Sequence, residues 1–93
     1  FDLVLLDCGQ YNDAWKYSHM TPEQGVKASL ELVAKQFMPI HWGAFTLSTH
    51  DWREPVVRAV NYALIKQVEI LTPEIGEIIT LGEKSINYWW ERY

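Results

Sequence analysis

Two short apolar runs in the first half of the chain have the pattern of β-strands. Residues 3–6 are continuously apolar between Asp2 and Asp7, which is typical of a strand buried on both faces. Residues 37–41 form a second run, in which Pro39 indicates an edge position or the start of a strand because proline lacks a backbone N–H. The sequence therefore predicts two strands, the first of them buried, separated by about thirty residues.

A strong start signal predicts a helix between these two strands. Thr21 is a suitable N-cap, Pro22 suits the first helical position, and Gln24 stands where a capping box requires it. We expect this helix to run to residue 35 or 36. Its core-facing stripe, taken from helical spacing, consists of Val26, Leu30, Val33 and Phe37.

A second helix is predicted from Glu54 and Pro55, again with proline in the first turn. The positions that continue it at helical spacing are Val57, Val60, Ala63 or Leu64, and Gln67. Two further apolar runs, residues 68–71 and 78–81, predict strands joined by a turn. The predicted order is β-α-β-α-β-β, and strands alternating with helices indicate an α/β layer structure.

The composition indicates a folded domain and argues against two kinds of function. Of the 93 residues, 48% are hydrophobic and 14% aromatic, and five are tryptophan, so the chain has much apolar surface to bury. The formal net charge of −4, without any run of Lys or Arg, argues against a nucleic-acid partner. The apolar runs are far shorter than the ~20 residues that a membrane-spanning helix needs.

The start of the chain and its one cysteine give two expectations about context. Phe1 stands at the beginning of an apolar run without an initiator Met, so we expect a fragment of a longer protein. Cys8 excludes an internal disulfide and is expected to be a small apolar residue at a strand end. A lone cysteine fits a reducing compartment, and we expect a cytoplasmic location.

His41 is the residue most indicative of chemistry, because it stands where a strand gives way to a loop. In α/β folds, ligands and metals collect at such positions. Gly43 lets the backbone turn tightly, and Trp42 and Phe45 are expected to wall a site. From these residues alone His41 is either a hydrogen-bonded structural histidine or a metal ligand.

Other polar residues give weaker signals. Four side chains supply possible metal donors, but their spacing matches no compact zinc motif, so we do not expect a self-contained site; they are Cys8, His19, His41 and His50. Residues 48–51 contain Ser, His and Asp, but a catalytic triad is defined by geometry rather than by adjacency. We predict a turn there that leads into the second helix, and we assign no catalytic residue within the chain.

Four short segments together form a more specific pattern than any of them alone. They are Asp-Leu-Val at residues 2–4 followed by Gly-Gln-Tyr at 9–11, Tyr-Ser-His-Met-Thr-Pro-Glu-Gln at 17–24, Met-Pro-Ile-His-Trp-Gly-Ala-Phe at 38–45, and Glu-Pro at 54–55. In order and spacing this pattern resembles the N-acyl-phosphatidylethanolamine phospholipase D-like branch of the metallo-β-lactamase superfamily, over residues 2–82. Ala44 is a departure, because that family has Thr there, and residues 50–51 replace an acidic-rich stretch.

The resemblance implies the C-terminal part of a metallo-β-lactamase fold, an αββα sandwich, over residues 1–93, with an aromatic tail at 81–93. It implies that His41 is the last histidine ligand of a two-zinc site, in which zinc polarises a phosphoryl or carbonyl oxygen and activates water. It also implies that His19 lies beside the metals and contacts a phosphate or similar anionic group of the substrate. For His19 an alternative stays open: a loop histidine that helps to close the start of the helix at Thr21.

Most of the implied site lies outside the chain. The family's main metal-binding histidine motif and the aspartate that bridges the two metals lie upstream, so Asp7 is not expected to be that bridge. The expected partner is therefore the missing N-terminal part of the same domain.

The implied function is a zinc-dependent hydrolase that acts on a phosphodiester, lactone or related ester, either a small molecule or lipid-like. The fragment alone is expected to be inactive. The alternative is a non-catalytic α/β interaction module that docks on the missing half or self-associates through exposed strand edges. Trp89, Trp90 and Tyr93 are expected to cover the core, or alternatively to contact another subunit.

Overall fold

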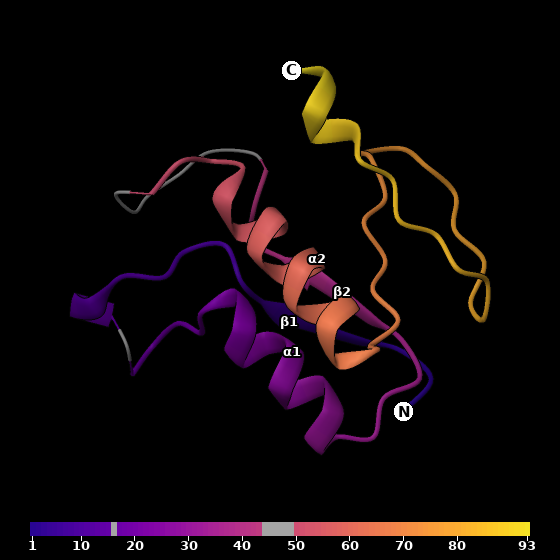
Figure 1. Ribbon diagram of the computed structural model, residues 1–93, viewed down its shortest axis with the longest axis horizontal. Coiled ribbons are helices and arrows are strands. Elements are labelled where there is room, and N and C mark those ends of the chain that lie inside the picture. The colour runs from indigo at the N-terminus through magenta and orange to yellow at the C-terminus, as the bar shows by residue number, and fades with distance from the viewer. Residues whose placement is uncertain (16, 44–49) are drawn as a thin grey trace.

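The computed structural model describes residues 1–15, 17–43 and 50–93. Ala44, Phe45 and the first two residues of the turn predicted at 48–51 therefore lie outside the described residues. The chain forms β1 (Val4–Asp7), η1 (Asp13–Trp15, a 3₁₀ turn), α1 (Pro22–Glu31), β2 (Phe37–Ile40), α2 (Glu54–Lys66) and η2 (Trp89–Arg92, a 3₁₀ turn), as Figure 1 shows. This confirms the predicted α/β class.

The two strands are parallel neighbours. Val4 lies opposite Phe37 at the start of the ladder, and Asp7 lies opposite Ile40 at its end. Ile70 adds a single parallel bridge to Phe37. Because parallel strands end at the same edge, this pairing brings the residues after β1 and after β2 together.

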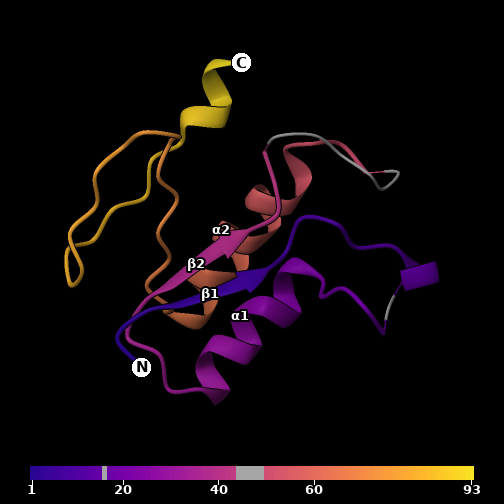
Figure 2. The same ribbon diagram turned by 180° about the vertical axis from the view of Figure 1, so that it is seen from behind.

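Both helices lie on the same face of the strands, side by side (Figure 1). Seen from behind, the strands lie in front of the helices, and no helix of the described part of the chain covers that face (Figure 2). The covered face buries Val4 and Phe37 with Val26 of α1 and Val60 of α2. On the strand β1 itself, Leu5 remains 49% exposed.

The predicted start of α1 is confirmed in its hydrogen bonds. Thr21 Oγ1 accepts from the Gln24 backbone N–H at 3.2 Å, and the Thr21 N–H donates to Gln24 Oε1 at 2.8 Å, which together form a capping box. The second helix begins at Glu54, with Pro55 in its first turn, as predicted.

The predicted end of α1 at residue 35 or 36 is wrong, because the helix ends at Glu31. The Ala34 N–H donates to the Ser29 carbonyl and the Val33 N–H to the Leu30 carbonyl, both at 3.0 Å, in the pattern of a Schellman motif. Val33 adopts the left-handed conformation at φ 53° and turns the chain away.

The predicted apolar stripes are correct only in part. In α1, Val26 is buried, but Leu30 is 47% and Val33 81% exposed because the helix ends beside them. In α2, Val57 and Leu64 are exposed, and the buried face consists of Pro55, Val56, Ala59, Val60 and Ala63. The small side chains of that face let α2 pack closely on its neighbours.

The last two predicted strands do not form. Residues 68–71 contribute only the bridge at Ile70, and residues 78–81 are irregular, with Ile78 92% exposed. The buried side chain of Gln36 holds this region instead: its Nε2 donates to the Glu83 carbonyl at 3.0 Å, and its Oε1 accepts from the Gly82 N–H at 2.8 Å. Side-chain bonds thus replace the ladder that the predicted order β-α-β-α-β-β required.

The aromatic tail covers the core, as predicted, through Trp89 and Trp90, which are both buried. Tyr93 does not share this role, because it is 70% exposed. Among residues 1–15, 17–43 and 50–93, no helix has the length and apolar character that crossing a membrane requires.

Candidate functional site

The carboxylate of Asp7 contacts both histidines that the motifs single out. His19 Nδ1 lies 2.9 Å from Asp7 Oδ2, and His41 Nδ1 lies 3.3 Å from Asp7 Oδ1. The Gly9 N–H donates to the same Oδ1 at 3.4 Å. Two histidines that lie far apart in the sequence therefore contact the same carboxylate.

Strand pairing and a close backbone approach build this arrangement. The Cys8 N–H donates to the Ile40 carbonyl at 3.2 Å, which extends the ladder past the end of β1. A Cβ atom on Gly9 would lie 1.5 Å from the His41 carbonyl oxygen, so only glycine permits this contact. His41 itself lies in the left-handed region at φ 64°.

His41 presents an imidazole that suits a metal ligand. Its side chain is 61% exposed, and its Nδ1 faces the carboxylate of Asp7. An ionised carboxylate accepts hydrogen bonds and donates none. Within the described residues no hydrogen bond engages Nε2 of His41. A ring held at Nδ1 by a carboxylate, with Nε2 left to the metal, is the usual arrangement of a zinc-binding histidine. His41 therefore suits one ligand position of a zinc ion, and the other ligands would have to come from outside the described residues.

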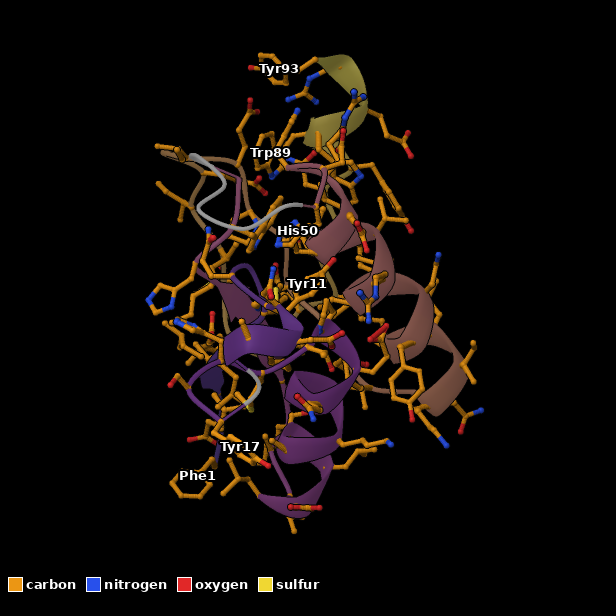
Figure 3. The ribbon with its side chains drawn as sticks, turned by 90° about the vertical axis from the view of Figure 1, so that its left-hand side faces the viewer. Phe1, Tyr11, Tyr17, His50, Trp89 and Tyr93 are labelled. Atoms are coloured by element: carbon orange, nitrogen blue, oxygen red, sulfur yellow. The ribbon has the colours of Figure 1, made fainter. Side chains whose placement is uncertain are left out.

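His19 borders a polar cavity of about 510 Å³. The cavity is also lined by Tyr11, Asn12, Gln24, His50 and Arg58. The rings of Tyr11 and His50 stack with centroids 4.1 Å apart, and Figure 3 shows the two side chains beside each other. The lining also contains Asp13, so the cavity suits a polar ligand, and Arg58 is the cationic group in it.

Arg58, which lines this cavity, belongs to a charged cluster between the two helices. Arg58 Nε donates to Glu23 Oε2 at 2.9 Å, and Arg58 Nη1 donates to Glu54 Oε1 at 3.2 Å. The hydrogen bonds to Glu23 raise the pKa of Arg58. Burial and a hydrogen bond to Glu54 raise the pKa of Tyr11, whose ring lies 4.6 Å from the Arg58 guanidinium carbon. At neutral pH, Arg58 is therefore charged and Tyr11 is neutral.

A smaller, mainly apolar hollow of about 250 Å³ is lined by His41. Trp42 and Trp89 line it, stacked with centroids 5.2 Å apart. Trp42 Nε1 donates to the Pro39 carbonyl at 2.9 Å, which fixes the indole beside the histidine. The expectation that Trp42 walls the site agrees with this position.

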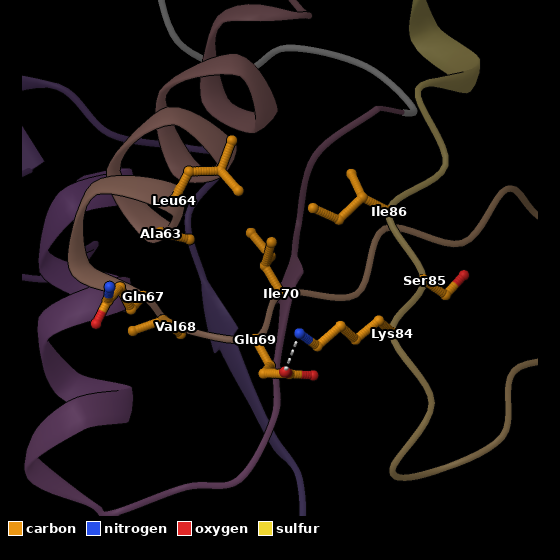
Figure 4. A pocket seen from close by; sticks show the side chains of 9 residues that line it. All are labelled: Ala63, Leu64, Gln67, Val68, Glu69, Ile70, Lys84, Ser85 and Ile86. Atoms are coloured by element: carbon orange, nitrogen blue, oxygen red, sulfur yellow. Dashed lines mark ion pairs between the residues drawn. The ribbon is translucent and has the colours of Figure 1, made fainter.

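Another cavity, of about 380 Å³, lies at the opposite end of the strands (Figure 4). Its lining includes Ala63, Val68, Ile70 and Ile86, and Lys84 pairs with Glu69 at 3.6 Å. Ile70 bridges the first residue of β2, whereas His41 follows the last. This cavity is therefore remote from the histidines.

The remaining candidate donors do not join the Asp7 cluster. The Cys8 side chain is fully buried, and burial together with the charge of Asp7 raises its pKa, which agrees with its expected role as a small apolar residue. His50 Nδ1 lies 3.0 Å from the Asp51 carbonyl, on the cavity side of Tyr11. Among the described residues, no group of three or more His, Cys, Asp or Glu has the arrangement of a metal site.

Asp7 contacts both candidate histidines, although the motifs do not single it out. Its position at the end of a buried strand, followed closely by Gly9, was the available signal. The sequence excludes Asp7 only as a bridge between metals, and in the structure Asp7 lies between two imidazoles.

Comparisons with known proteins match this architecture. The family described as "Beta-lactamase superfamily domain" matches residues 1–42. An uncharacterised protein of Mycobacterium tuberculosis is 38% identical over 94 residues, which cover 97% of this chain and 25% of that protein. The chain thus spans about a quarter of the length of that relative.

Two further relatives carry an enzyme name. The mitochondrial N-acyl-phosphatidylethanolamine-hydrolysing phospholipase D of Saccharomyces cerevisiae is 40% identical over 55 residues, covering 57% of this chain and 12% of that protein. N-acyl-phosphatidylethanolamine-hydrolysing phospholipase D 1 of Caenorhabditis elegans is 26% identical over 85 residues, covering 84% of this chain and 24% of that protein. The chain is therefore similar to the β-lactamase superfamily domain over residues 1–42, and it resembles the N-acyl-phosphatidylethanolamine-hydrolysing phospholipases D.

Proposed function

We propose that this chain supplies one corner of the active site of a zinc-dependent hydrolase that cleaves a phosphodiester, lactone or related ester. His41 would be a zinc ligand, and His19 would contact the anionic group of the substrate. The other ligands would come from the rest of the domain, so the 93-residue chain alone is expected to be inactive.

The observation that carries this proposal is the convergence of His19 and His41 on Asp7. His41 is 61% exposed at a strand end, which is where ligands bind in α/β folds, whereas a histidine with only a structural role is usually more buried. The superfamily match over residues 1–42 gives independent support for a hydrolase.

Each residue of the corner has a separate role in the proposed reaction. Nε2 of His41 would bind zinc, and zinc would act as a Lewis acid on a phosphoryl or carbonyl oxygen. His19 would orient the substrate from the polar cavity it borders, and Trp42 would limit access of water from the other side.

The test uses the longer protein that contains this chain together with the rest of the proposed domain. Metal analysis of the purified protein should find about two zinc ions, and zinc should fall substantially in a His41→Ala variant. A His50→Ala variant is the matched control, since His50 is not in contact with Asp7, and it should retain its zinc.

Activity is measured on a chromogenic phosphodiester and on a simple lactone. We expect hydrolysis of at least one of them, and we expect the rate to fall by about two orders of magnitude or more in the His41→Ala variant. A longer protein that binds no zinc and hydrolyses neither compound would refute the proposal.

The helix-free face of the sheet favours a second role for the chain. Leu5 lies on this face and is 49% exposed, and the Mycobacterium tuberculosis relative is about four times as long as the part of it that this chain matches. We propose that the remainder of the same domain packs here. If the longer protein lacks zinc, this docking role would remain as the function of the chain.

A further inference from the structure

We propose that Asp7 is a positioning residue that fixes the tautomer and orientation of both His19 and His41. This inference rests on the proposed function, because it concerns how the zinc ligand and the substrate-contacting histidine are prepared. It assigns a role to a residue that the motifs leave without one.

The hydrogen-bond chemistry of the three side chains fixes where the imidazole protons lie. An ionised carboxylate only accepts, so each imidazole that faces it must present an N–H. Both contacts are made by Nδ1, at 2.9 Å for His19 and 3.3 Å for His41. Neutral rings in this position carry their proton on Nδ1 and an electron pair on Nε2.

The position of these protons decides which nitrogen of His41 can bind a metal. A histidine binds zinc through a nitrogen that carries a free electron pair, so the Nδ1–H tautomer prepares Nε2 of His41. Without the carboxylate the ring could rotate about its side-chain bonds, because His41 is 61% exposed. Asp7 itself is only 17% exposed and is held further by the Gly9 N–H, so it is a firm anchor.

One carboxylate holds two imidazole rings at the same time. Oδ2 serves His19 and Oδ1 serves His41, so moving Asp7 would displace both. The spacing between the zinc ligand and the substrate-contacting histidine would therefore be set by a single side chain at the end of β1.

The experiment measures tautomers by long-range ¹H–¹⁵N NMR on the 93-residue chain labelled at histidine. It is run at about pH 9, above the range in which imidazole usually takes up a proton. His19 and His41 should both show the Nδ1–H form. His50 is an internal reference, because its Nδ1 faces a backbone carbonyl, which can only accept.

The decisive variant is Asp7→Asn, which keeps the shape of the side chain. An amide has one accepting oxygen and one donating nitrogen, so it can hold one ring as Nδ1–H and must receive the other as an Nδ1 acceptor. We expect one of the two histidines to switch to the Nε2–H form. In Asp7→Ala both should lose their fixed tautomer, while His50 stays unchanged.

Asp2→Asn is the matched control, because Asp2 is an exposed carboxylate that pairs with Lys35 at 3.2 Å and contacts neither histidine. It should leave all three spectra unchanged. Amide spectra that stay dispersed show that each variant is folded. Tautomers of His19 and His41 that do not respond to Asp7→Asn or Asp7→Ala in a folded chain would overturn the inference.

A second measurement separates this inference from the proposed function. In the longer protein, Asp7→Asn should weaken zinc binding about 10- to 100-fold, with zinc alone as the probe. If the tautomers respond but the longer protein binds no zinc, the proposed function fails and the positioning role stands. If zinc binds normally and the tautomers ignore Asp7, the positioning role fails alone.

Discussion

At the end of β1, the backbone of Gly9 touches the carbonyl of His41 so closely that a side chain cannot be fitted between them. The same turn presents the Gly9 N–H to Asp7, whose carboxylate meets His41 and His19. A position without a side chain therefore decides whether the histidine cluster can assemble.

Gly9→Ala should reduce the free energy of unfolding by about 3 kcal/mol or more, because the new Cβ would lie 1.5 Å from the His41 oxygen and the backbone must move. Urea denaturation of the chain measures this loss. Gly25→Ala is the control, since its Cβ would meet Asp7 and Phe37 at 3.4 and 3.5 Å, which is ordinary contact. That helical change should be neutral or stabilising by up to about 1 kcal/mol. Equal effects of the two changes would contradict the close-approach account.

The sequence allowed prediction of single site residues but not of their arrangement. His41 and His19 stand in recognisable segments, so each could be singled out by position alone. The contacts of Asp7 could not be predicted in this way, because they depend on the parallel pairing of Asp7 with Ile40, which is distant in the sequence. Local pattern carries no information about such a contact.

At the scale of the elements, α1 ends on an unusual residue. Val33 holds the left-handed position of a Schellman motif, where glycine is the common residue, and it is 81% exposed. A β-branched side chain in this conformation is strained by about 1–2 kcal/mol.

Val33→Gly should therefore raise the free energy of unfolding by about 1 kcal/mol, after part of the relieved strain is offset by the flexibility of glycine in the unfolded chain. Gln67→Gly is the matched comparison, since Gln67 ends α2 at φ 57° without a β-branch and should gain less. Thermal or urea unfolding measures both. A destabilised Val33→Gly variant would show that the valine side chain makes a contribution larger than its strain.

The contact between α1 and α2 depends on the ionisation of Glu23. Burial disfavours its charged form, but the hydrogen bonds and charge of Arg58 outweigh this and hold the pKa of Glu23 below its ordinary value. The resulting stabilisation is present above the pKa of the unfolded state, about 4.3, and is lost as the pH falls through the lower folded-state pKa.

Glu23→Gln should cost about 1 kcal/mol of unfolding free energy at pH 7, and the difference from the unsubstituted chain should vanish in more acidic solution. Urea denaturation over a series of pH values between 7 and about 3 follows this change. Glu31→Gln, at the exposed end of the same helix, should show no comparable loss. A Glu23→Gln deficit that is independent of pH would exclude the ion pair as its cause.

Element starts were predictable because their signals are local. The capping box at Thr21 and the proline after Glu54 act within one turn, and both helices begin there. The end of α1 could not be predicted, because a valine in the sequence does not indicate the left-handed conformation that Val33 adopts. Residues 78–81 have a strand-like sequence but no strand beside them, because Gln36 holds the neighbouring turn by its side chain.

At the scale of the whole molecule, one face of the sheet is covered by both helices and the other carries no helix of the described chain (Figure 2). Leu5 is 49% exposed on that side. If the rest of the domain packs there, a charge at Leu5 should matter only in the longer protein.

Leu5→Glu should change the stability of the 93-residue chain by less than about 0.5 kcal/mol and should destabilise the longer protein by about 2 kcal/mol or more. Leu30→Glu, at a 47% exposed position on α1, should have a small effect in both. Unfolding curves of the four variant proteins make the comparison. A harmless Leu5→Glu in the longer protein would place the remainder of the domain elsewhere.

Anomalous diffraction at the zinc edge from crystals of the longer protein would locate the metal directly. We expect a zinc peak about 2.0–2.1 Å from Nε2 of His41, with Nδ1 of the same ring on Asp7. A zinc site that excludes His41, or that is bound through its Nδ1, would contradict this expectation.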